Sequence, residues 1–244
     1  MIILFLSAIL GGFAYFVFPK FDQKQFSNIL IFAGSYLFAI TIIHILPEVY
    51  NVYPYFARIG GFVIIGFFLQ LLLESFSSGV EHGHIHKNSN FKKSGGGFSP
   101  WMLLIGLCLH SFLEGTIVTN PSEDPGHHHA EGIMFGIIIH KIPAAFALVT
   151  FLIYYTGNKS ISFIYLTIFA LASPLGLATS EWLIHQNLIS DQSKAILFAI
   201  VSGSFLHIST TIFFESNPGH RFSLLKALIS LAGVGLAVLV ELFM

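Results

Sequence analysis

Eight long apolar segments, separated by short polar connections, dominate the pattern of residues along this chain. A helix needs about 20 mainly apolar residues to cross a bilayer. Segments of about that length lie at residues 1–18, 26–46, 57–77, 100–119, 132–154, 161–184, 194–214 and 223–243. The first segment lacks the basic start of a secretory signal, so we count it as a span. The pattern predicts an all-α, polytopic membrane protein with eight transmembrane helices in a single domain over residues 1–244.

The composition excludes a soluble domain. Hydrophobic residues make up 55% of the chain and charged residues only 9%, and the mean hydropathy is +0.79. A soluble domain carries about 25% charged residues. The formal net charge of −1 gives no basic field for nucleic acid, so we expect no such partner. The single cysteine, Cys108, excludes an intrachain disulfide framework and a cysteine-based zinc finger.

The basic residues predict the orientation, because Lys and Arg gather in cytoplasmic loops. If the N-terminus lies outside, Arg58 and Lys194 are the basic residues of the outer connections. The inner connections then hold Lys20, Lys24, Lys87, Lys92, Lys93, Lys159, Arg221 and Lys226. We therefore expect both termini outside.

The longest connection, residues 78–99, is polar and glycine-rich and carries alternating His82, His84 and His86. Such a tract can hold a metal loosely through neutral imidazole, or it can be a solvated linker. The connection after residue 119 carries His127, His128 and His129. It either concentrates cations near an entrance or forms a solvated turn.

Ionisable residues inside apolar spans are costly and mark ion paths by default. His110 and Glu114 are four residues apart and therefore share one helical face, and His140 lies in the next span. Pro143 should free the carbonyl of Ile139 close to His140 and bend the helix. Broken backbone near mid-membrane recurs in transporter sites. A lone intramembrane histidine can instead hydrogen-bond a neighbouring helix, but three such groups on two consecutive spans favour an ion site.

Other polar groups within the spans have two readings each. His44 and Glu48 either line an entrance or cap an interface, and His207 either lines an inner exit or makes interhelical hydrogen bonds. For Glu181 and His185 we favour interfacial solvation. Gln70 and Glu74 are interpreted as helix-packing or interfacial groups.

Several short motifs occur in a specific order. Span four carries His110-x-x-x-Glu114-Gly115, and span five reads HKIPAAFALVTF from His140. The second span ends His44-Ile-Leu-Pro-Glu48, and the seventh contains Gly203-Ser-Phe-Leu-His207. Together with eight spans and a histidine-rich loop after the third, these motifs resemble the ZIP (Zrt-, Irt-like protein) metal transporters over nearly the whole chain. The fifth span looks most like the branch that reads H-K-x-P-A-A-F.

The resemblance implies inverted three-helix repeats, residues 1–77 and 161–244, around a central metal-site helix pair at residues 100–154. His110, Glu114 and His140 match ligand positions of the family. Ser111, Lys141 and Ala144 depart from its binuclear pattern, and Ser173 falls where some members place another Glu. An ammonium offers a metal no lone pair, so we expect one transport site with Lys141 standing in for a second ion. The competing view is that Lys141 reaches water along its flexible stem.

Imidazole and carboxylate suit Zn²⁺, Fe²⁺ or Mn²⁺ as the transported ion, with zinc preferred. The resemblance implies flow toward the cytoplasm across a cell membrane, plasma or bacterial inner, with no prosthetic group and with a homodimer as a possible assembly. The alternative is an intramembrane metal-dependent enzyme. A zinc protease would carry H-E-x-x-H, and no histidine here is followed by Glu. We therefore expect a transporter and not an enzyme.

Overall fold

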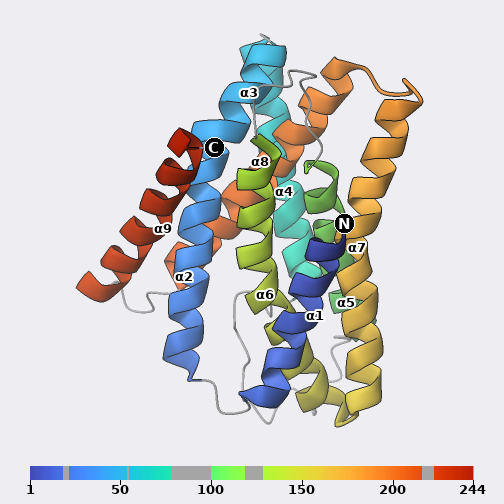
Figure 1. Cartoon of the computed structure of the whole chain (residues 1–244), viewed down its shortest axis with the longest axis vertical. Coiled ribbons are helices and arrows are strands. Elements are labelled where there is room, and N and C mark those ends of the chain that lie inside the picture. The colour runs from blue at the N-terminus through green and yellow to red at the C-terminus, as the bar shows by residue number, and fades with distance from the viewer. Residues whose placement is uncertain (19–21, 54, 78–99, 119–128, 216–222, 244) are drawn as a thin grey trace.

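The computed structural model describes residues 1–18, 22–53, 55–77, 100–118, 129–215 and 223–243. Within these ranges every regular element is a helix, and the helices form one bundle (Figure 1). They are α1 (Ile2–Val17), α2 (Gln23–Ile40), the π-turn η1 (Thr41–Ile45), α3 (Leu46–Val52), α4 (Phe56–Ser77), α5 (Pro100–Thr116), α6 (His129–Thr156), α7 (Lys159–His185), α8 (Asp191–Glu215) and α9 (Leu224–Phe243). The histidine-rich loop, with His82, His84 and His86, lies outside the described residues.

Because α2, η1 and α3 form one continuous rod, the described helices make eight rods, in the order of the eight apolar segments. Six of these rods are long and apolar enough to cross a membrane. The other two, α1 with 16 residues and α5 with 17, are shorter. The prediction of an all-α, polytopic membrane protein is confirmed.

The second rod is longer than its sequence pattern suggested. The apolar segment was expected to end at residue 46, but the helix continues to Val52. Pro47 has no N–H, and its ring crowds the carbonyl four residues earlier, that of Ile43. Ile43 lies inside the π-turn, where the N–H of Leu46 bonds to the carbonyl of Thr41. This wider turn directly before the proline lets the helix pass it and places His44 on the turn.

The packing of the rods repeats across the molecule. The rod that contains α2 packs on α9 and α4 on α8, while α1 packs on α6 and α5 on α7. Exchanging α1 with α7, α2 with α8, α4 with α9 and α5 with α6 maps each of these pairings onto another. In Figure 1 α1 runs downward and α7 upward. This is the arrangement of two inverted three-helix repeats around the pair α5 and α6.

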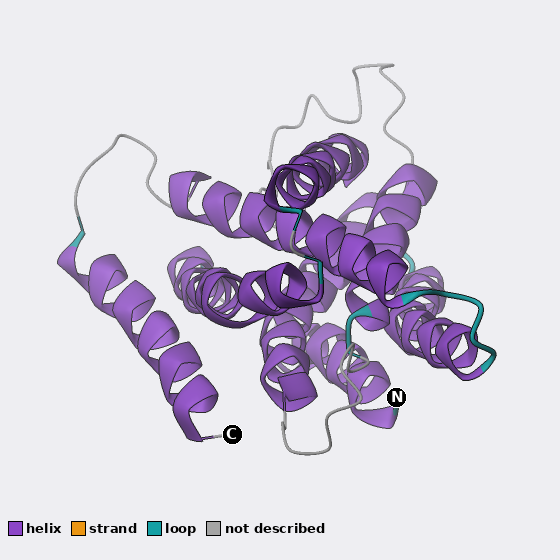
Figure 2. Cartoon of the chain, turned by 90° about the horizontal axis from the view of Figure 1, so that it is seen from above, coloured by secondary structure: helices purple, strands orange, loops and turns teal. Residues whose placement is uncertain are grey.

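Helix α6, one of the two central helices, is far more buried than α9. In α6, 67% of the most apolar window is buried, compared with 11% in α9, which lies at the edge of the bundle (Figure 2). The exposed side chains of α9 are large and aliphatic, among them Leu228, Leu231 and Leu239. Such surface suits lipid and not water. His140 and Lys141, near the middle of α6, are each 1% exposed and are therefore screened from the bilayer by other helices.

Small residues bring α5 and α7 into backbone contact beside this centre. A Cβ at Gly115 of α5 would collide with the carbonyl of Ser173, and one at Gly176 of α7 would collide with that of Phe112. Close approach through small residues is a common way for transmembrane helices to pack. The contact places Ser111 of α5 directly beside Ser173 of α7.

Candidate metal centre

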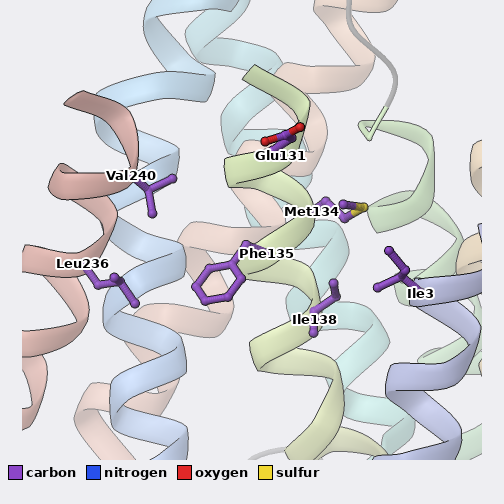
Figure 3. Close-up of a pocket in the computed structure, with 7 residues that line it drawn as sticks. All are labelled: Ile3, Glu131, Met134, Phe135, Ile138, Leu236 and Val240. Atoms are coloured by element: carbon purple, nitrogen blue, oxygen red, sulfur yellow. The ribbon is translucent and has the colours of Figure 1, made fainter. Parts of the chain in front are cut away.

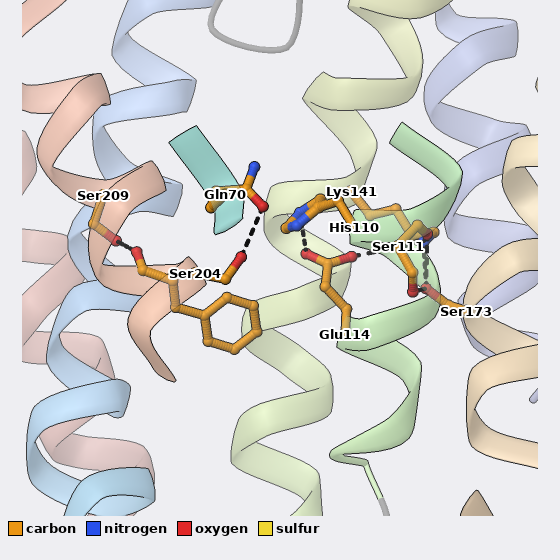
Figure 4. Close-up of polar contacts among 9 residues, drawn as sticks. Gln70, His110, Ser111, Glu114, Lys141, Ser173, Ser204 and Ser209 are labelled. Atoms are coloured by element: carbon orange, nitrogen blue, oxygen red, sulfur yellow. Dashed lines mark hydrogen bonds and ion pairs between the residues drawn. The ribbon is translucent and has the colours of Figure 1, made fainter. Parts of the chain in front are cut away.

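Three ligand-type side chains meet between α5 and α6. His110 and Glu114 project from one face of α5, and His140 projects from the middle of α6. The ligand atoms of the three all lie within 4.8 Å of one another, and each residue is at most 4% exposed. His110 Nε2 lies 3.0 Å from Glu114 Oε1 (Figure 4). We call these residues the His–Glu–His group. The structure thus brings together the three side chains that the sequence singled out.

The histidine on α6 is placed for more than packing. Its ring lies 6.0 Å from that of His110, at 88° to it. His140 is 1% exposed, and neither ring nitrogen has a hydrogen-bond partner among the described residues. Leaving a buried polar group unpaired costs about 1–3 kcal/mol. A metal ion bound to a ring nitrogen of His140 would offset this cost, so the unpaired nitrogens favour a metal-binding role.

The spacing suits one small cation. Zinc bonds to nitrogen and oxygen are about 2.0–2.2 Å, so two ligand atoms on one ion lie at most about 4.2 Å apart. The group spans up to 4.8 Å, so small side-chain rotations would close it. Neutral imidazoles and a carboxylate form a donor set for borderline divalent ions. Helix α6 continues through Pro143 without a break, so no unwound segment contributes ligands here.

The next residue along each central helix belongs to a different cluster. Lys141 is 1% exposed, and its ammonium donates to the hydroxyls of Ser111 and Ser173 (Figure 4). The two hydroxyls are 2.9 Å apart, and Ser173 donates to the carbonyl of Ser111 at 2.7 Å. We call Ser111, Lys141 and Ser173 the lysine cluster. Because Lys141 is enclosed in this way, the view that it reaches water along its stem is wrong.

Two further contacts stabilise this ammonium. Lys141 Nζ lies 3.8 Å from Glu114 Oε2, which is a Coulombic contact too long for a hydrogen bond. It also lies 4.8 Å from the centre of the Phe169 ring, within range of a cation–π interaction. The lysine cluster and the His–Glu–His group therefore share the Glu114 carboxylate. Ala144, one turn further along α6, is buried among apolar residues.

The accessory histidine of the second rod has a partner that sequence reasoning missed. His44 Nδ1 lies 3.0 Å from Glu241 Oε2 on α9, and its Nε2 lies 3.6 Å from Glu48 Oε2. Glu241 is the only acidic residue of α9. Searching every apolar segment for ionisable residues would have found it.

The accessory histidine of the seventh rod pairs across α8 and α4. His207 Nδ1 lies 3.4 Å from Glu74 Oε2, and its ring packs edge-on against Phe67. On the same two helices, Ser204 donates to Gln70 Oε1 at 2.8 Å. Gln70 and Glu74 therefore act between helices, in agreement with the packing interpretation. Glu181 and His185 are exposed at the end of α7, as interfacial solvation requires.

A groove of about 310 Å³ lies between α1, α6 and α9 (Figure 3). It is lined by Ile3, Met134, Phe135, Ile138, Leu236 and Val240, with Glu131 among them. One carboxylate among aliphatic and aromatic side chains does not provide a ligand set for an ion. The groove contains none of the His–Glu–His group, so we exclude it as the ion site.

Comparison with known proteins places this geometry in a family. The model of the family described as ZIP Zinc transporter matches residues 81–241. Zinc transporter ZIP9 of Xenopus tropicalis is 26% identical over 162 residues, which cover 63% of this chain and 51% of that protein. Zinc transporter ZIP1 of Takifugu rubripes is 30% identical over 143 residues, covering 56% and 45%. Protein zntD of Dictyostelium discoideum is 28% identical over 167 residues, covering 65% and 24%.

The chain spans about half the length, or less, of these curated relatives. The family match nevertheless covers well over half of the chain, and it contains both clusters on the central helices. The family consists of transporters and not of enzymes. The chain therefore belongs to the ZIP zinc transporter family.

Proposed function

We propose that this protein carries divalent transition-metal ions, zinc first among them, across a membrane toward the cytoplasm. The observation that carries the proposal is the His–Glu–His group, buried between the two central helices of a ZIP family member. The fit of His110, Glu114 and His140 to zinc, and the names of the relatives, favour zinc over Fe²⁺ or Mn²⁺.

The donor set suits transport more than storage. A transport site must bind well enough to load and weakly enough to release. Three protein ligands without a thiolate leave room for water in a tetrahedral shell. Ligand exchange with water then offers the ion a route out of the site.

The lysine cluster limits the centre to one ion. Without a metal, the charges of Glu114 and Lys141 cancel. One dication therefore already leaves the centre with excess positive charge, and a second would double that excess in a setting of low dielectric constant. Ser111, Ser173 and Ala144 add no carboxylate to balance it. Lys141 thus acts as a fixed cation beside a single exchangeable one and weakens its binding.

The charges at the two ends of the bundle support the direction. At the end where α3 lies, the described acidic residues are Glu48, Glu131, Glu181, Asp191 and Glu241, and the basic ones are Arg58 and Lys194. At the opposite end the acidic residues of the described helices and their caps are Asp22, Glu74 and Glu215, and the basic ones are Lys24, Lys159 and Lys226. Acidic surface raises the local cation concentration, and basic residues gather on the cytoplasmic side. The acidic surface and the distribution of basic residues both support an outer position for the α3 end, where ions would enter.

The remaining parts of the proposal concern the path and the setting. His44 and Glu48 would line the entrance, His207 the exit, and His82, His84 and His86 would capture metal in the cytoplasm. We assign the chain to the branch of the family with an H-K-x-P-A-A-F fifth span, on the residues from His140 to Phe146. The setting is the cell membrane, plasma or bacterial inner, and a second copy of the chain is the expected protein partner.

Uptake by purified protein in liposomes tests the proposal. We expect saturable Zn²⁺ flux that Fe²⁺ and Mn²⁺ inhibit in competition, and no flux through the Glu114→Ala variant. The Glu181→Ala variant, which changes an exposed carboxylate at the α3 end, is the matched control and should transport normally. Absence of metal flux through correctly folded wild-type protein would overturn the proposed transport function. Flux that does not saturate would indicate a channel and not a carrier.

A further inference from the structure

We propose that His44 and Glu48 form a second divalent-cation site at the α3 end of the bundle, and that Glu241 on α9 orients the histidine. This capture site is separate from the His–Glu–His group. It extends the proposed function, because it would load ions before they reach the centre. It stands on different residues and can be tested on its own.

The contact with α9 sets the state of the imidazole. His44 Nδ1 lies 3.1 Å from Glu241 Oε1 and 3.0 Å from Oε2, within hydrogen-bond distance of both oxygens. A carboxylate can only accept a hydrogen bond, so Nδ1 carries the proton and the Nε2 lone pair of the neutral ring points elsewhere. Metal-ligating histidines commonly donate their other N–H to a carboxylate in this way. Glu241 therefore has the position of an orienting residue and not of a ligand.

Glu48 supplies the second ligand. It lies four residues after His44, on the same side of the rod, and its Oε2 is 3.6 Å from His44 Nε2. That distance is too long for a hydrogen bond, but two ligands of one zinc ion are about 3.4 Å apart in tetrahedral geometry. Both carboxylate oxygens of Glu48 are buried, and neither accepts a hydrogen bond from the part of the chain that the structure describes. A buried carboxylate without donors is suited to a cation.

Comparison of the two inverted repeats distinguishes residues that only pack helices together from residues that can bind a metal ion. Under the exchange of α2 with α8 and α4 with α9, the His44–Glu241 contact corresponds to the His207–Glu74 contact. A histidine paired with a glutamate near the end of the partner helix is thus common to both ends. Four residues after His207 the chain has Thr211. The carboxylate of Glu48 therefore has no counterpart after His207, and the packing contact that both ends share does not account for it.

The centre repeats the same spacing. His110 and Glu114 are also four residues apart, with Nε2 and Oε1 at 3.0 Å. The capture site differs in having two protein ligands where the centre has three, and the side chains of Glu48 and Glu241 are 14% and 31% exposed, compared with 2% for Glu114. The π-turn under His44 fits this role, since such turns occur frequently at functional sites. We expect weaker and faster binding than at the centre.

Cobalt binding to the full chain tests the capture site without relying on transport. The background variant changes His110, Glu114 and His140 to Ala, which removes all three ligands of the centre, and changes His82, His84, His86, His127, His128 and His129 to Ser. In this background, visible absorption titrated with Co²⁺ should show one weak site per chain. Glu48→Gln, which keeps the side-chain shape, and His44→Ala should each abolish it, while Glu241→Gln should weaken it about tenfold.

The matched control is Glu181→Gln, which changes a carboxylate at the same end of the bundle and should leave the Co²⁺ titration unchanged. If Co²⁺ does not bind in the background variant, or binds equally after Glu48→Gln, the capture site is wrong and His44 with its two glutamates is only a helix-packing contact. Failure of the proposed function would look different. In that case restoring His110, Glu114 and His140 in the same background would add no second, tighter site.

Discussion

The His–Glu–His group and the lysine cluster are built from neighbouring residues of the same two helices, yet they treat positive charge in opposite ways. His110 and His140 offer lone pairs, whereas Ser111 and Lys141, one residue further on, enclose an ammonium. Neighbouring residues on an α-helix point about 100° apart. One pair of helices therefore presents two different faces to the interior: one holds the Lys141 ammonium, and we propose that the other binds an exchangeable cation.

The two clusters meet at a single carboxylate. Glu114 touches His110 through one oxygen and faces Lys141 through the other. An ion that binds the first cluster must share this charge with the second. We propose that this difference has a functional consequence, because a fixed ammonium would keep the metal affinity low enough for release.

The largest expected effect comes from removing the shared carboxylate. We expect Glu114→Ala to lower Zn²⁺ flux in liposomes at least about 100-fold, because it removes the only charged ligand of the His–Glu–His group. The protein should still insert and elute as a single species in size-exclusion chromatography. Flux near the wild-type level in this variant would show that the centre lies elsewhere.

Reversing the charge of the lysine cluster should change the number of metal ions that bind at the centre. Lys141→Glu replaces the fixed cation by a carboxylate next to Glu114, and two buried carboxylates call for further positive charge. We expect mass spectrometry of the purified protein to find two centrally bound Zn²⁺ ions per chain where the parent protein has one. Lys194→Glu, a change at a lysine paired with Asp191 near the start of α8, is the control. If Lys141→Glu still binds one central Zn²⁺ ion per chain, Lys141 does not set the number of ions.

A smaller effect should follow from loosening the lysine cluster. Ser173→Ala removes one acceptor from Lys141 and the hydrogen bond to the Ser111 carbonyl. We expect a loss of about 1–3 kcal/mol in the free energy of unfolding, measured by thermal denaturation in detergent, with flux reduced less than about tenfold. Ser209→Ala removes a hydroxyl that bonds only within its own helix, and it should have little effect. Equal destabilisation by both changes would argue against a special role for Ser173.

The smallest effect is expected outside the bundle. Replacing His82, His84 and His86 by Ser should leave the maximal Zn²⁺ flux within about twofold of the parent, because a polar loop cannot supply ligands at mid-membrane. The same liposome assay measures it, at matched protein content. Complete loss of flux would show that the loop, and not the His–Glu–His group alone, is essential for transport.

The sequence was enough to predict the eight rods and the members of the His–Glu–His group. Apolar length decides the first, and the cost of burying His110, Glu114 and His140 in lipid decides the second. It did not reveal the hydroxyl acceptors of Lys141, because Ser111 and Ser173 come from two helices whose approach depends on Gly115 and Gly176.

Two further features depend on tertiary structure. The pairing of His44 with Glu241 joins residues 197 positions apart in sequence. The extension of the second rod past Pro47 depends on a π-turn that hydrophobic periodicity does not signal. In each case a local pattern identified the residue, and only packing identified its partner or its backbone.

We propose that one ion binds between α5 and α6, with Lys141 as its fixed neighbour. Anomalous X-ray scattering at the zinc edge, from crystals of the Zn²⁺-loaded protein, tests it most directly. We expect one strong central peak, within bonding distance of His110, Glu114 and His140, with Lys141 still bonded to Ser111 and Ser173. Two central peaks, or a single peak that displaces Lys141 from the serines, would contradict it.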